Sequence, residues 1–521
     1  MKMDGTKGKN KRSDIGSSVL KGLLLGAFVL IYLLLLFGDH KLVAEFMIPN
    51  FILLFVVVAI WTLIVRYIRF PIIPDMSNKT ENVCLCTLTV LVLAVQSIIT
   101  YSIIFRTGWD VTAVWYGSHW VAIGDTAGIQ NMSEYFSIYP NNLLLVYLFS
   151  RVLKLNLLLG SPISNGGLLL ALVQCGVMNF SGIVLFKCAK RFVGQRASWY
   201  VYFIYVVLID LSGWMVLPYS DGVGVIFPVT FLYLYLRWKE CLNNNKKNLY
   251  IYFMLAIGVV AYRIKPYTTI VLISVFIIET FNLLKRIKQG LMIAWKSYVI
   301  ETLVAMAGFL CASVLTSQLI YSMGFTIDDG REMGVSHYLM MGLNDNSWGG
   351  FSEEDFKFSD AIYGKELKRQ SELKMAKSRL SEMGVTGYVN LVIHKFAKDY
   401  LDGTFGWGRS DTFYMEIYPS RGTISNILRS WYYGYGNLFS YHALIRQLLW
   451  VGVLIFVPFS SITKKEFNTI EKVLIFSVLG FILYLQLFEA QARYVFVFAP
   501  LFQILAAIGE KNMNKRIRRK N

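Results

Sequence analysis

The sequence predicts an all-α protein that crosses a membrane many times. Of its 521 residues, 55% are hydrophobic and only 16% are charged, and the mean hydropathy is +0.50. A chain with this much apolar surface cannot hide it in one soluble core, so lipid must be part of its solvent. The net charge of +18 comes mainly from short loops and from both ends of the chain, which is typical of topology signals and not of nucleic-acid binding.

Twelve apolar segments predict about twelve transmembrane helices, with both termini in the cytoplasm. The loops assigned to the cytoplasm are rich in Lys and Arg and poor in Asp and Glu, as the positive-inside rule requires. The predicted crossings are residues 19–37, 46–67, 83–105, 166–185, 199–217, 223–236, 249–262, 267–284, 298–323, 444–459, 473–488 and 494–508.

A thirteenth apolar stretch, residues 143–158, is interrupted by Arg151 and Lys154. If it also crossed, the basic residues of 187–196 would lie outside, against the positive-inside rule. We therefore expect this stretch to lie in the outer interface as an amphipathic helix.

These features divide the chain into four regions. Residues 1–82 hold a basic cytoplasmic tail and two N-terminal spans, and residues 83–323 form a transmembrane core with a first external loop at 106–165. Residues 324–442 form a large external region of balanced charge, expected to contain short helices on the outer surface. Residues 443–521 supply three more spans and a basic cytoplasmic tail.

Carboxylates at the outer ends of spans are the candidate catalytic groups. Asp110 and Asp125 lie among several aromatic residues directly after the third predicted span, and Asp221 follows the fifth. Aromatic side chains settle at the membrane surface, and ionisable groups held there are costly unless they serve a function. The alternative is an ordinary aromatic belt with solvated aspartates.

Basic residues on the outer side are the candidate anion-binding groups. Arg263 and Lys265 lie at an external corner, against the positive-inside trend, and Arg106 and Arg493 are also external. Their alternative role is to reach lipid head groups. For Arg493 the spacing from Glu489 favours a structural i,i+4 ion pair.

Further candidates lie in the external regions. His337 and Asn344 are candidates for positioning a donor or an acceptor, unless 324–442 is a lid without ligand contact. His119 with Asp125 gives only two possible metal ligands, so we predict no protein-bound metal and leave open a divalent cation.

Five short stretches lie in a fixed order at the outer ends of predicted spans. They are GWD at 108–110, YPNN at 139–142, YSD at 219–221, RIKP at 263–266 and EAQARY at 489–494. With the two long external regions, this layout resembles the GT-C membrane glycosyltransferases, particularly the protein O-mannosyltransferase and aminoarabinose-transferase type. The two spans before residue 83 are an addition to the usual plan, and Pro140-Asn141 stands where a double proline is usual.

The resemblance implies that a sugar moves from a polyprenyl-phosphate carrier to an acceptor on the outer face of the cell membrane. The expected acceptor is a glycan or lipid-linked polymer of a bacterial cell envelope. An inverting transfer needs a base for the acceptor hydroxyl. We expect Asp110 to be this base, in preference to Asp125 and Asp221. The carrier phosphate needs cations as it leaves. The expected substrate-binding residues are Arg263, Lys265, Arg106, Tyr139, His337, Asn344 and Arg493.

Two other classes of protein stay open. A polysaccharide polymerase or ligase also joins lipid-linked sugars through a large external loop. A lipid-linked oligosaccharide flippase or a secondary transporter should carry polar groups in mid-membrane and show internal pseudo-symmetry, whereas the ionisable groups here cluster at the outer ends of the spans.

Overall fold

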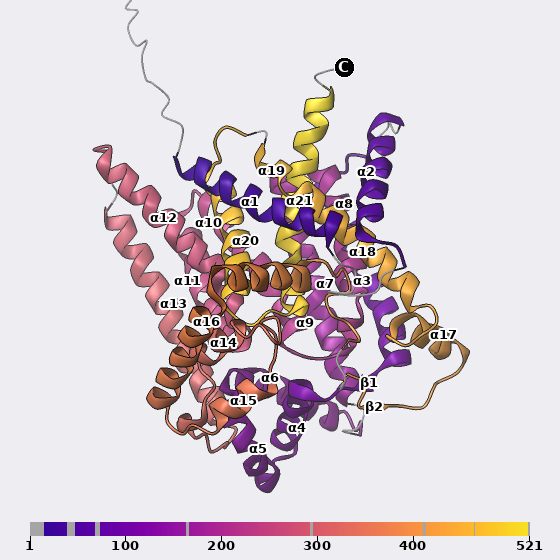
Figure 1. Ribbon diagram of the computed structural model, residues 1–521, viewed down its shortest axis with the longest axis vertical. Coiled ribbons are helices and arrows are strands. Elements are labelled where there is room, and N and C mark those ends of the chain that lie inside the picture. Colours follow the sequence, from indigo (N-terminus) through magenta and orange to yellow (C-terminus); the bar gives the residue numbers. More distant parts are fainter. Residues whose placement is uncertain are drawn as a thin grey trace, which may run out of the picture.

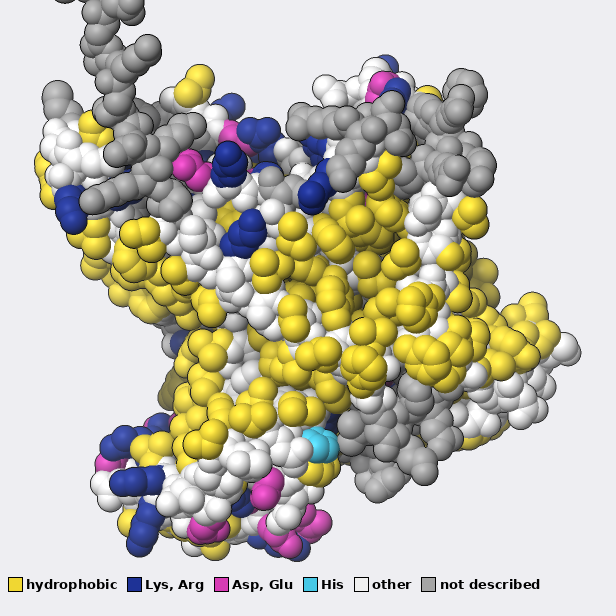
Figure 2. Space-filling model, turned by 45° about the horizontal axis from the view of Figure 1, so that its top comes forward, with side chains coloured by type: hydrophobic (Ala, Val, Ile, Leu, Met, Phe, Trp, Pro, Cys, Tyr) yellow, Lys and Arg dark blue, Asp and Glu magenta, His cyan; other side chains and the backbone are white. Residues whose placement is uncertain are grey.

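A computed structural model describes residues 15–38, 47–67, 73–162, 166–291, 295–409, 413–462 and 464–518. The basic start of the chain therefore lies outside the described residues, as does part of the loop after the second predicted span. The helices form a bundle with a broad apolar band, and charged side chains gather at its two ends (Figures 1 and 2).

Within these residues, nine helices are long and apolar enough to cross a membrane. Each coincides with a predicted crossing. They are α1 (Ile15–Phe37), α3 (Asn78–Ile103), α7 (Gly166–Val193), α11 (Asn244–Ile264), α12 (Ile270–Lys288), α13 (Trp295–Tyr321), α18 (Phe439–Phe456), α20 (Thr469–Leu487) and α21 (Ala492–Arg518). The short helix α19 (Phe459–Ile462) follows α18.

The other three predicted crossings also form helices but are not among these nine. They are α2 (Asn50–Tyr67), α8 (Gln195–Tyr205) and α10 (Ile226–Glu240), the last preceded by the one-turn α9 (Ser220–Gly224). The total of twelve therefore stays a prediction.

Residues 199–217 do not form the single helix that their hydropathy predicts. After α8 the chain makes a π-helical turn at Val206–Asp210 and a 3-10 turn at Gly213–Val216. Arg446 of α18 donates to backbone carbonyls in the π turn, at Val207 and Leu208. A Cβ on Gly213 would lie only 2.1 Å from the Trp407 ring, so the break leaves room for that side chain.

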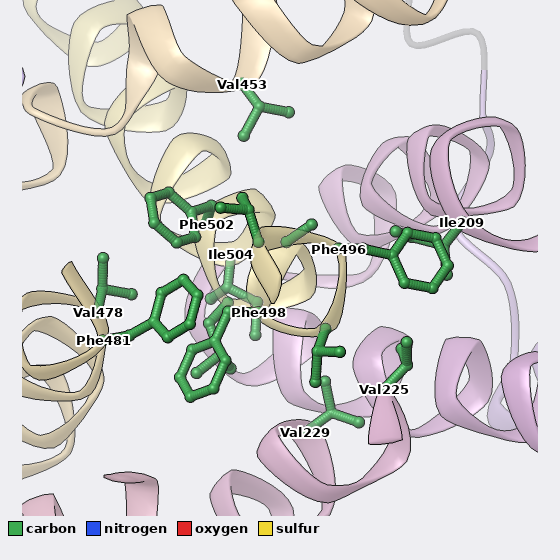
Figure 3. Close-up of a cluster of buried hydrophobic side chains, with 14 of the residues drawn as sticks. Ile209, Val225, Val229, Val453, Val478, Phe481, Phe496, Phe498, Phe502 and Ile504 are labelled. Atoms are coloured by element: carbon green, nitrogen blue, oxygen red, sulfur yellow. The ribbon is translucent and has the colours of Figure 1, made fainter. Parts of the chain in front are cut away.

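The last helix, α21, forms the centre of the bundle. Of its apolar stretch 83% is buried, more than in any other of the nine helices. Phe498 stacks on Phe481 of α20 with ring centroids 4.1 Å apart (Figure 3). Phe502 packs against Trp450 of α18. This dense packing makes α21 a rigid support for the residues at its first turn.

The segment predicted to be the first external loop folds into helices at one end of the bundle (Figure 1). These are α4 (Trp109–Ile123), α5 (Thr126–Ile138) and α6 (Leu143–Leu158). Gly124 ends α4 with φ at +73°, a conformation that glycine adopts at little cost, and Asp125 caps the start of α5. The helix α6 has only 16 residues and packs on α4. Its place in the membrane interface stays a prediction.

The region 324–442 contains α14 (Val335–Gly342), α15 (Glu353–Asp360), α16 (Lys365–Tyr400) and α17 (Thr423–Tyr432). The 36-residue α16 bends at Gly384. Strand β2 (Glu416–Ile417) pairs antiparallel with β1 (Phe105–Arg106) and so ties this region to the start of α4.

The expectation of short surface helices throughout 324–442 is wrong for the end of α16 and the residues after it. This segment enters the bundle, where Tyr400 packs on Phe502 and Trp407 packs on Trp214. Its aromatic side chains belong to the main core, which a reading of loop polarity does not reveal.

Candidate active site

The carboxylate of Asp110 is held by two tyrosine hydroxyls from different parts of the chain. Tyr135 of α5 donates to Oδ1 at 2.7 Å, and Tyr219 donates to Oδ2 at 3.0 Å. The side-chain amide of Asn142 donates to the Tyr135 oxygen at 3.3 Å. The carboxylate is therefore oriented by α5 and by the turn before α9.

The backbone before Asp110 is strained. Trp109 has φ at +45°, a region that residues with a Cβ rarely occupy. Its ring packs edge-on against Tyr219 at 5.6 Å, and the Arg493 guanidinium lies over it at 4.6 Å. These contacts hold the strained turn in place and bring Arg493 close to the residue that precedes Asp110.

A buried ion pair lies beside these groups. Lys265 Nζ is 2.7 Å from Asp221 Oδ1 and donates to Ser220 Oγ at 3.1 Å. The same ammonium lies 5.4 Å from the centre of the Tyr219 ring. Burial lowers the pKa of Lys265, and the charge of Asp221 opposes that shift. Pro266 ends α11 at this point, so Lys265 is the residue on which the chain turns.

Glu489 and Arg493 do not form the predicted helical ion pair. Helix α20 ends at Leu487 and α21 begins at Ala492, so residues 489–491 are not helical and the i,i+4 spacing does not apply. Glu489 instead accepts hydrogen bonds from Tyr494 at 2.7 Å and from Gln491 at 3.2 Å. Arg493 is left facing the aromatic rings of Trp109 and Tyr494.

Together these residues form what we call the Asp110 cluster: Asp110, Tyr135, Tyr219, Asp221, Lys265, Glu489, Arg493 and Tyr494. Its members differ in accessibility. Asp110 and Arg493 are half-buried, whereas Asp221 and Lys265 are only 1% and 7% exposed. A carboxylate and a guanidinium on half-buried residues, beside a closed ion pair, are groups that could serve an acceptor hydroxyl and an anionic leaving group, respectively.

Asp125 and Arg263, both predicted site residues, lie outside this cluster. Asp125 caps α5 by accepting from the backbone of Ala127 and Gly128, at the opposite end of α4 from Asp110. Arg263 donates to Ser317 of α13 at 2.6 Å. Although Arg263 is close in sequence to Lys265, its guanidinium is engaged on another helix.

Arg106 and Tyr139 lie at the edges of the Asp110 cluster. Arg106 donates to Glu416 at 3.0 Å and to the Tyr116 hydroxyl at 2.6 Å, which fixes the β1–β2 pair on α4. Tyr139 packs on Tyr135 with ring centroids 5.3 Å apart. Burial raises the pKa of Tyr139, and the charge of Asp110 adds to the shift.

His337 and Asn344 are structural members of the α14–α16 region. His337 is buried and hydrogen-bonded to Ser359 at 2.8 Å. Asn344 donates to Asp355, which also pairs with Arg379 of α16. Both side chains therefore join α14 to its neighbours, and the structure does not place them in the Asp110 cluster.

The comparisons with known proteins identify a family. Residues 19–513 match the family model described as conserved hypothetical integral membrane protein. The chain belongs to this family. It is thus a multi-pass integral membrane protein, although no curated protein matches its sequence.

Solved structures resemble this integral membrane protein only distantly. One is the archaeal oligosaccharyltransferase AglB from Archaeoglobus fulgidus, in complex with an inhibitory peptide and a dolichol-phosphate. The match has 12% sequence identity and a TM-score of 0.37, and it covers 81% of this chain and 50% of the AglB chain. Another is ArnT from Cupriavidus metallidurans bound to undecaprenyl phosphate, with 13% identity, 85% and 79% of the chains covered and a TM-score of 0.31. The chain spans half the length of the AglB chain that it matches.

Sequence reasoning missed the tyrosines that hold Asp110 and a second charged group close to them. Tyr135 carries no local signal, because it meets Asp110 only after α4 and α5 fold back on each other. On α16, Lys395 donates to three backbone carbonyls, and Asp399 is fully buried nearby. Burial lowers the pKa of Lys395 and raises that of Asp399. The available signal was the i,i+4 spacing of Lys395 and Asp399, which puts the two charges on one face of a helix.

No metal site emerges from the residues that the structure describes, among which no three His, Cys, Asp or Glu side chains form a group that could hold an ion. His119 and Asp125, the two possible metal ligands, make different contacts in the structure. His119 stacks on Trp115 with ring centroids 5.1 Å apart, and burial lowers its pKa, while Asp125 caps α5.

Proposed function

We propose that this protein is a membrane glycosyltransferase of the GT-C type. It moves a sugar from a polyprenyl-phosphate carrier to a glycan or lipid-linked acceptor of the cell envelope. In this proposal the Asp110 cluster faces the outside of the cell membrane and both termini are cytoplasmic. The supporting observation is that the half-buried residues Asp110 and Arg493 lie on either side of Trp109: Asp110 follows it in the chain, and the Arg493 guanidinium lies over its ring.

Asp110 is the proposed base. As the acceptor hydroxyl attacks the anomeric carbon, its proton passes to the Asp110 carboxylate, the new carbon–oxygen bond forms and the bond to the carrier phosphate breaks. The hydroxyls of Tyr135 and Tyr219 hold both carboxylate oxygens, so one orientation is kept before the acceptor arrives.

Arg493 is the proposed contact for the carrier phosphate. A phosphate leaves without a proton donor, provided that cations stabilise its growing charge. Arg493 presents a planar set of donors that matches phosphate oxygens, and its ring contacts fix its position.

The Lys265–Asp221 pair is proposed to position these groups. The Lys265 ammonium is already satisfied by Asp221 and Ser220, and it is buried, so it contributes through Tyr219 and through the local field. Arg263 is left without a role at the phosphate because it is engaged with Ser317.

The test is a transfer assay with purified protein, radiolabelled polyprenyl-phosphate sugars and membrane extracts. We expect label to move from the carrier to a glycan or lipid-linked product, and Asp110→Asn to abolish that movement. Label that crosses vesicle membranes while it stays on the carrier would instead indicate a flippase. Joining of whole lipid-linked glycans, with no use of single sugars, would indicate a polymerase or ligase.

A further inference from the structure

A pocket of about 280 Å³ lies between the end of α17, the connection 433–437 that follows it and β2. Its wall contains Arg429, Ser430, Tyr433, Tyr435 and Asn437, with Ile417 of β2 on the other side. None of these residues belongs to the Asp110 cluster. The pocket is smaller than the sites of drug-sized ligands, which occupy about 300–1,000 Å³, so it suits one small unit of a larger molecule.

Helix α17 is fixed to the last turn of α3. The carbonyls there have no partners within α3, and α17 supplies donors for them. Ser425 donates to the Ser102 carbonyl at 2.5 Å and Arg429 to the same oxygen at 3.2 Å. Arg421 donates to the carbonyl of Tyr101. The helix therefore lies at the level where α3 ends, beside the two residues of β1.

The exposed apolar side of α17 indicates how it meets the membrane. Ile424 is 66% exposed and Ile427 is 56% exposed. At 3.6 residues per turn, Ile424 and Ile427 lie roughly 140° and 160° around the helix from Arg429. The part of the molecule that carries α17 projects from the bundle at the right of Figures 1 and 2. With the isoleucines in lipid, as in an interfacial amphipathic helix, the pocket faces water.

The chemistry of the pocket wall fits a carbohydrate. Tyr435 is 64% exposed and offers a ring face and a hydroxyl, and Asn437 offers an amide that both donates and accepts. Arg429 uses one donor on Ser102 and one on the Pro419 carbonyl, which fixes its plane and leaves further donors of its five N–H groups. Flat aromatic surface with mixed donors and acceptors matches a sugar ring and its hydroxyls.

The pocket is also connected to the candidate active site. Ile417 in its wall pairs with Phe105 of β1, and Phe105 packs on Tyr433 with ring centroids 5.6 Å apart. Strand β1 leads directly into the strained turn at Trp109 and so to Asp110.

We propose that this α17 pocket binds a sugar unit of a glycan acceptor, at a distance from the bond that is made. That the bound sugar belongs to an acceptor rests on the proposed function. That a sugar binds at all rests on the pocket alone. The occupant approaches from the aqueous side, and the bilayer lies under the opposite face of α17.

The test measures glycan binding directly. Fluorescently labelled full-length protein in lipid nanodiscs is applied to an array of defined oligosaccharides, and the dissociation constant of the best ligand is then measured in solution. We expect saturable binding, weakened at least about tenfold by Tyr435→Ala with Asn437→Ala, because a stacking surface and an amide are removed together. Tyr441→Ala is the matched control, since Tyr441 is also exposed (49%) but lies outside the pocket.

Two results would overturn the inference: no glycan bound by the unaltered protein, or equal binding by the pocket variant and the control. Failure of the proposed function is recognised separately. If the pocket variant loses glycan binding while no sugar transfer is found under any condition, the pocket stands and the transferase proposal fails. If Asp110→Asn abolishes transfer while the pocket variant keeps its acceptor KM, the transferase proposal stands and the pocket fails.

Discussion

The Asp110 cluster has an accessible half and a closed half. Asp110 and Arg493 are half-buried, whereas Asp221 and Lys265 are paired at 2.7 Å and almost completely buried. Both halves contain one acid and one base at the outer ends of predicted spans, so the sequence gives no reason to separate them. Only the burial distinguishes groups that can touch a substrate from groups that can only hold others in place.

The two halves should therefore respond differently to substitution, one by losing activity and the other by losing stability. Removing an accessible group should reduce the reaction and leave the fold stable, because no buried charge loses its partner. Removing one member of the closed pair should destabilise the protein, because the other charge stays buried. The variants below test that separation, from the largest expected effect to the smallest.

Asp110→Asn should reduce sugar transfer by about 10²–10⁴-fold, the range of a lost general base. The melting temperature in detergent should stay within a few degrees of the unaltered protein. Asp125→Asn is the control, because asparagine caps a helix as well as aspartate does and Asp125 lies outside the cluster. Full transfer activity in the Asp110→Asn variant would show that Asp110 is not the base.

Lys265→Met should destabilise the protein by about 3–5 kcal/mol, since the Asp221 carboxylate remains buried without its partner. Asp221→Leu combined with Lys265→Met should recover most of that stability, because an apolar pair replaces the ions, but it should not recover transfer. Thermal unfolding of the single and the double variant gives the comparison. A single variant as stable as the unaltered protein would mean that the pair is not closed.

Arg493→Gln should weaken the use of donor about 10- to 100-fold in KM, the range expected for lost charge-assisted hydrogen bonds to phosphate. The donor KM of Arg493→Lys should lie between those of the unaltered protein and Arg493→Gln, because lysine keeps the charge but loses the planar donors. Arg263→Gln should change the donor KM less than about twofold, since Arg263 is engaged with Ser317. A reversed order of the two arginines would put the phosphate at Arg263.

Tyr219→Phe should lower transfer about fivefold, which corresponds to one hydrogen bond of about 1 kcal/mol to Asp110. Tyr267→Phe is the matched control, because the buried hydroxyl of Tyr267 has no hydrogen-bond partner. That variant should be neutral or slightly stabilising. Equal losses in both variants would show that ring packing, and not the bond to Asp110, is being measured.

The smallest effect on transfer should come from His337, which lies outside the cluster. Burial lowers its pKa to about 4, below the value of about 6.5 expected in the unfolded chain. The unfolded state therefore binds more protons between these values, so stability is complete above pH 6.5 and is lost as the pH falls towards 4. The difference in melting temperature between the unaltered protein and His337→Gln, followed from pH 7 to 4.5, isolates this contribution.

The sequence predicts the long helices well and the interrupted ones poorly. Hydropathy is a sum over a window, so it locates nine helices long enough to span a membrane but does not detect the π turn after α8 or the small space at Gly213. The end of α16 shows the same limit. Its polar sequence suggests a surface helix, whereas Tyr400 and Trp407 complete the core around α21.

The position of a charged residue at the end of a predicted span helped to predict the candidate site. Nearness of two residues in the sequence did not. Asp110, Asp221, Lys265 and Arg493 were each found because they follow or precede an apolar segment, and the structure brings them together. Arg263 is two residues from Lys265, yet Arg263 contacts Ser317 of α13 whereas Lys265 pairs with Asp221. Contacts between distant segments, such as Tyr135 with Asp110, depend on packing that no local pattern records.

The central claim is that the accessible half of the cluster receives the phosphate of a polyprenyl carrier. An experimental density map of the protein in nanodiscs with polyprenyl phosphate tests it most directly. The account predicts phosphate density within hydrogen-bonding distance of Arg493, on the side of Trp109 that faces Asp110. Phosphate bound at Arg263 and Ser317, or any arrangement that leaves Asp110 and Arg493 without lipid contact, would contradict it.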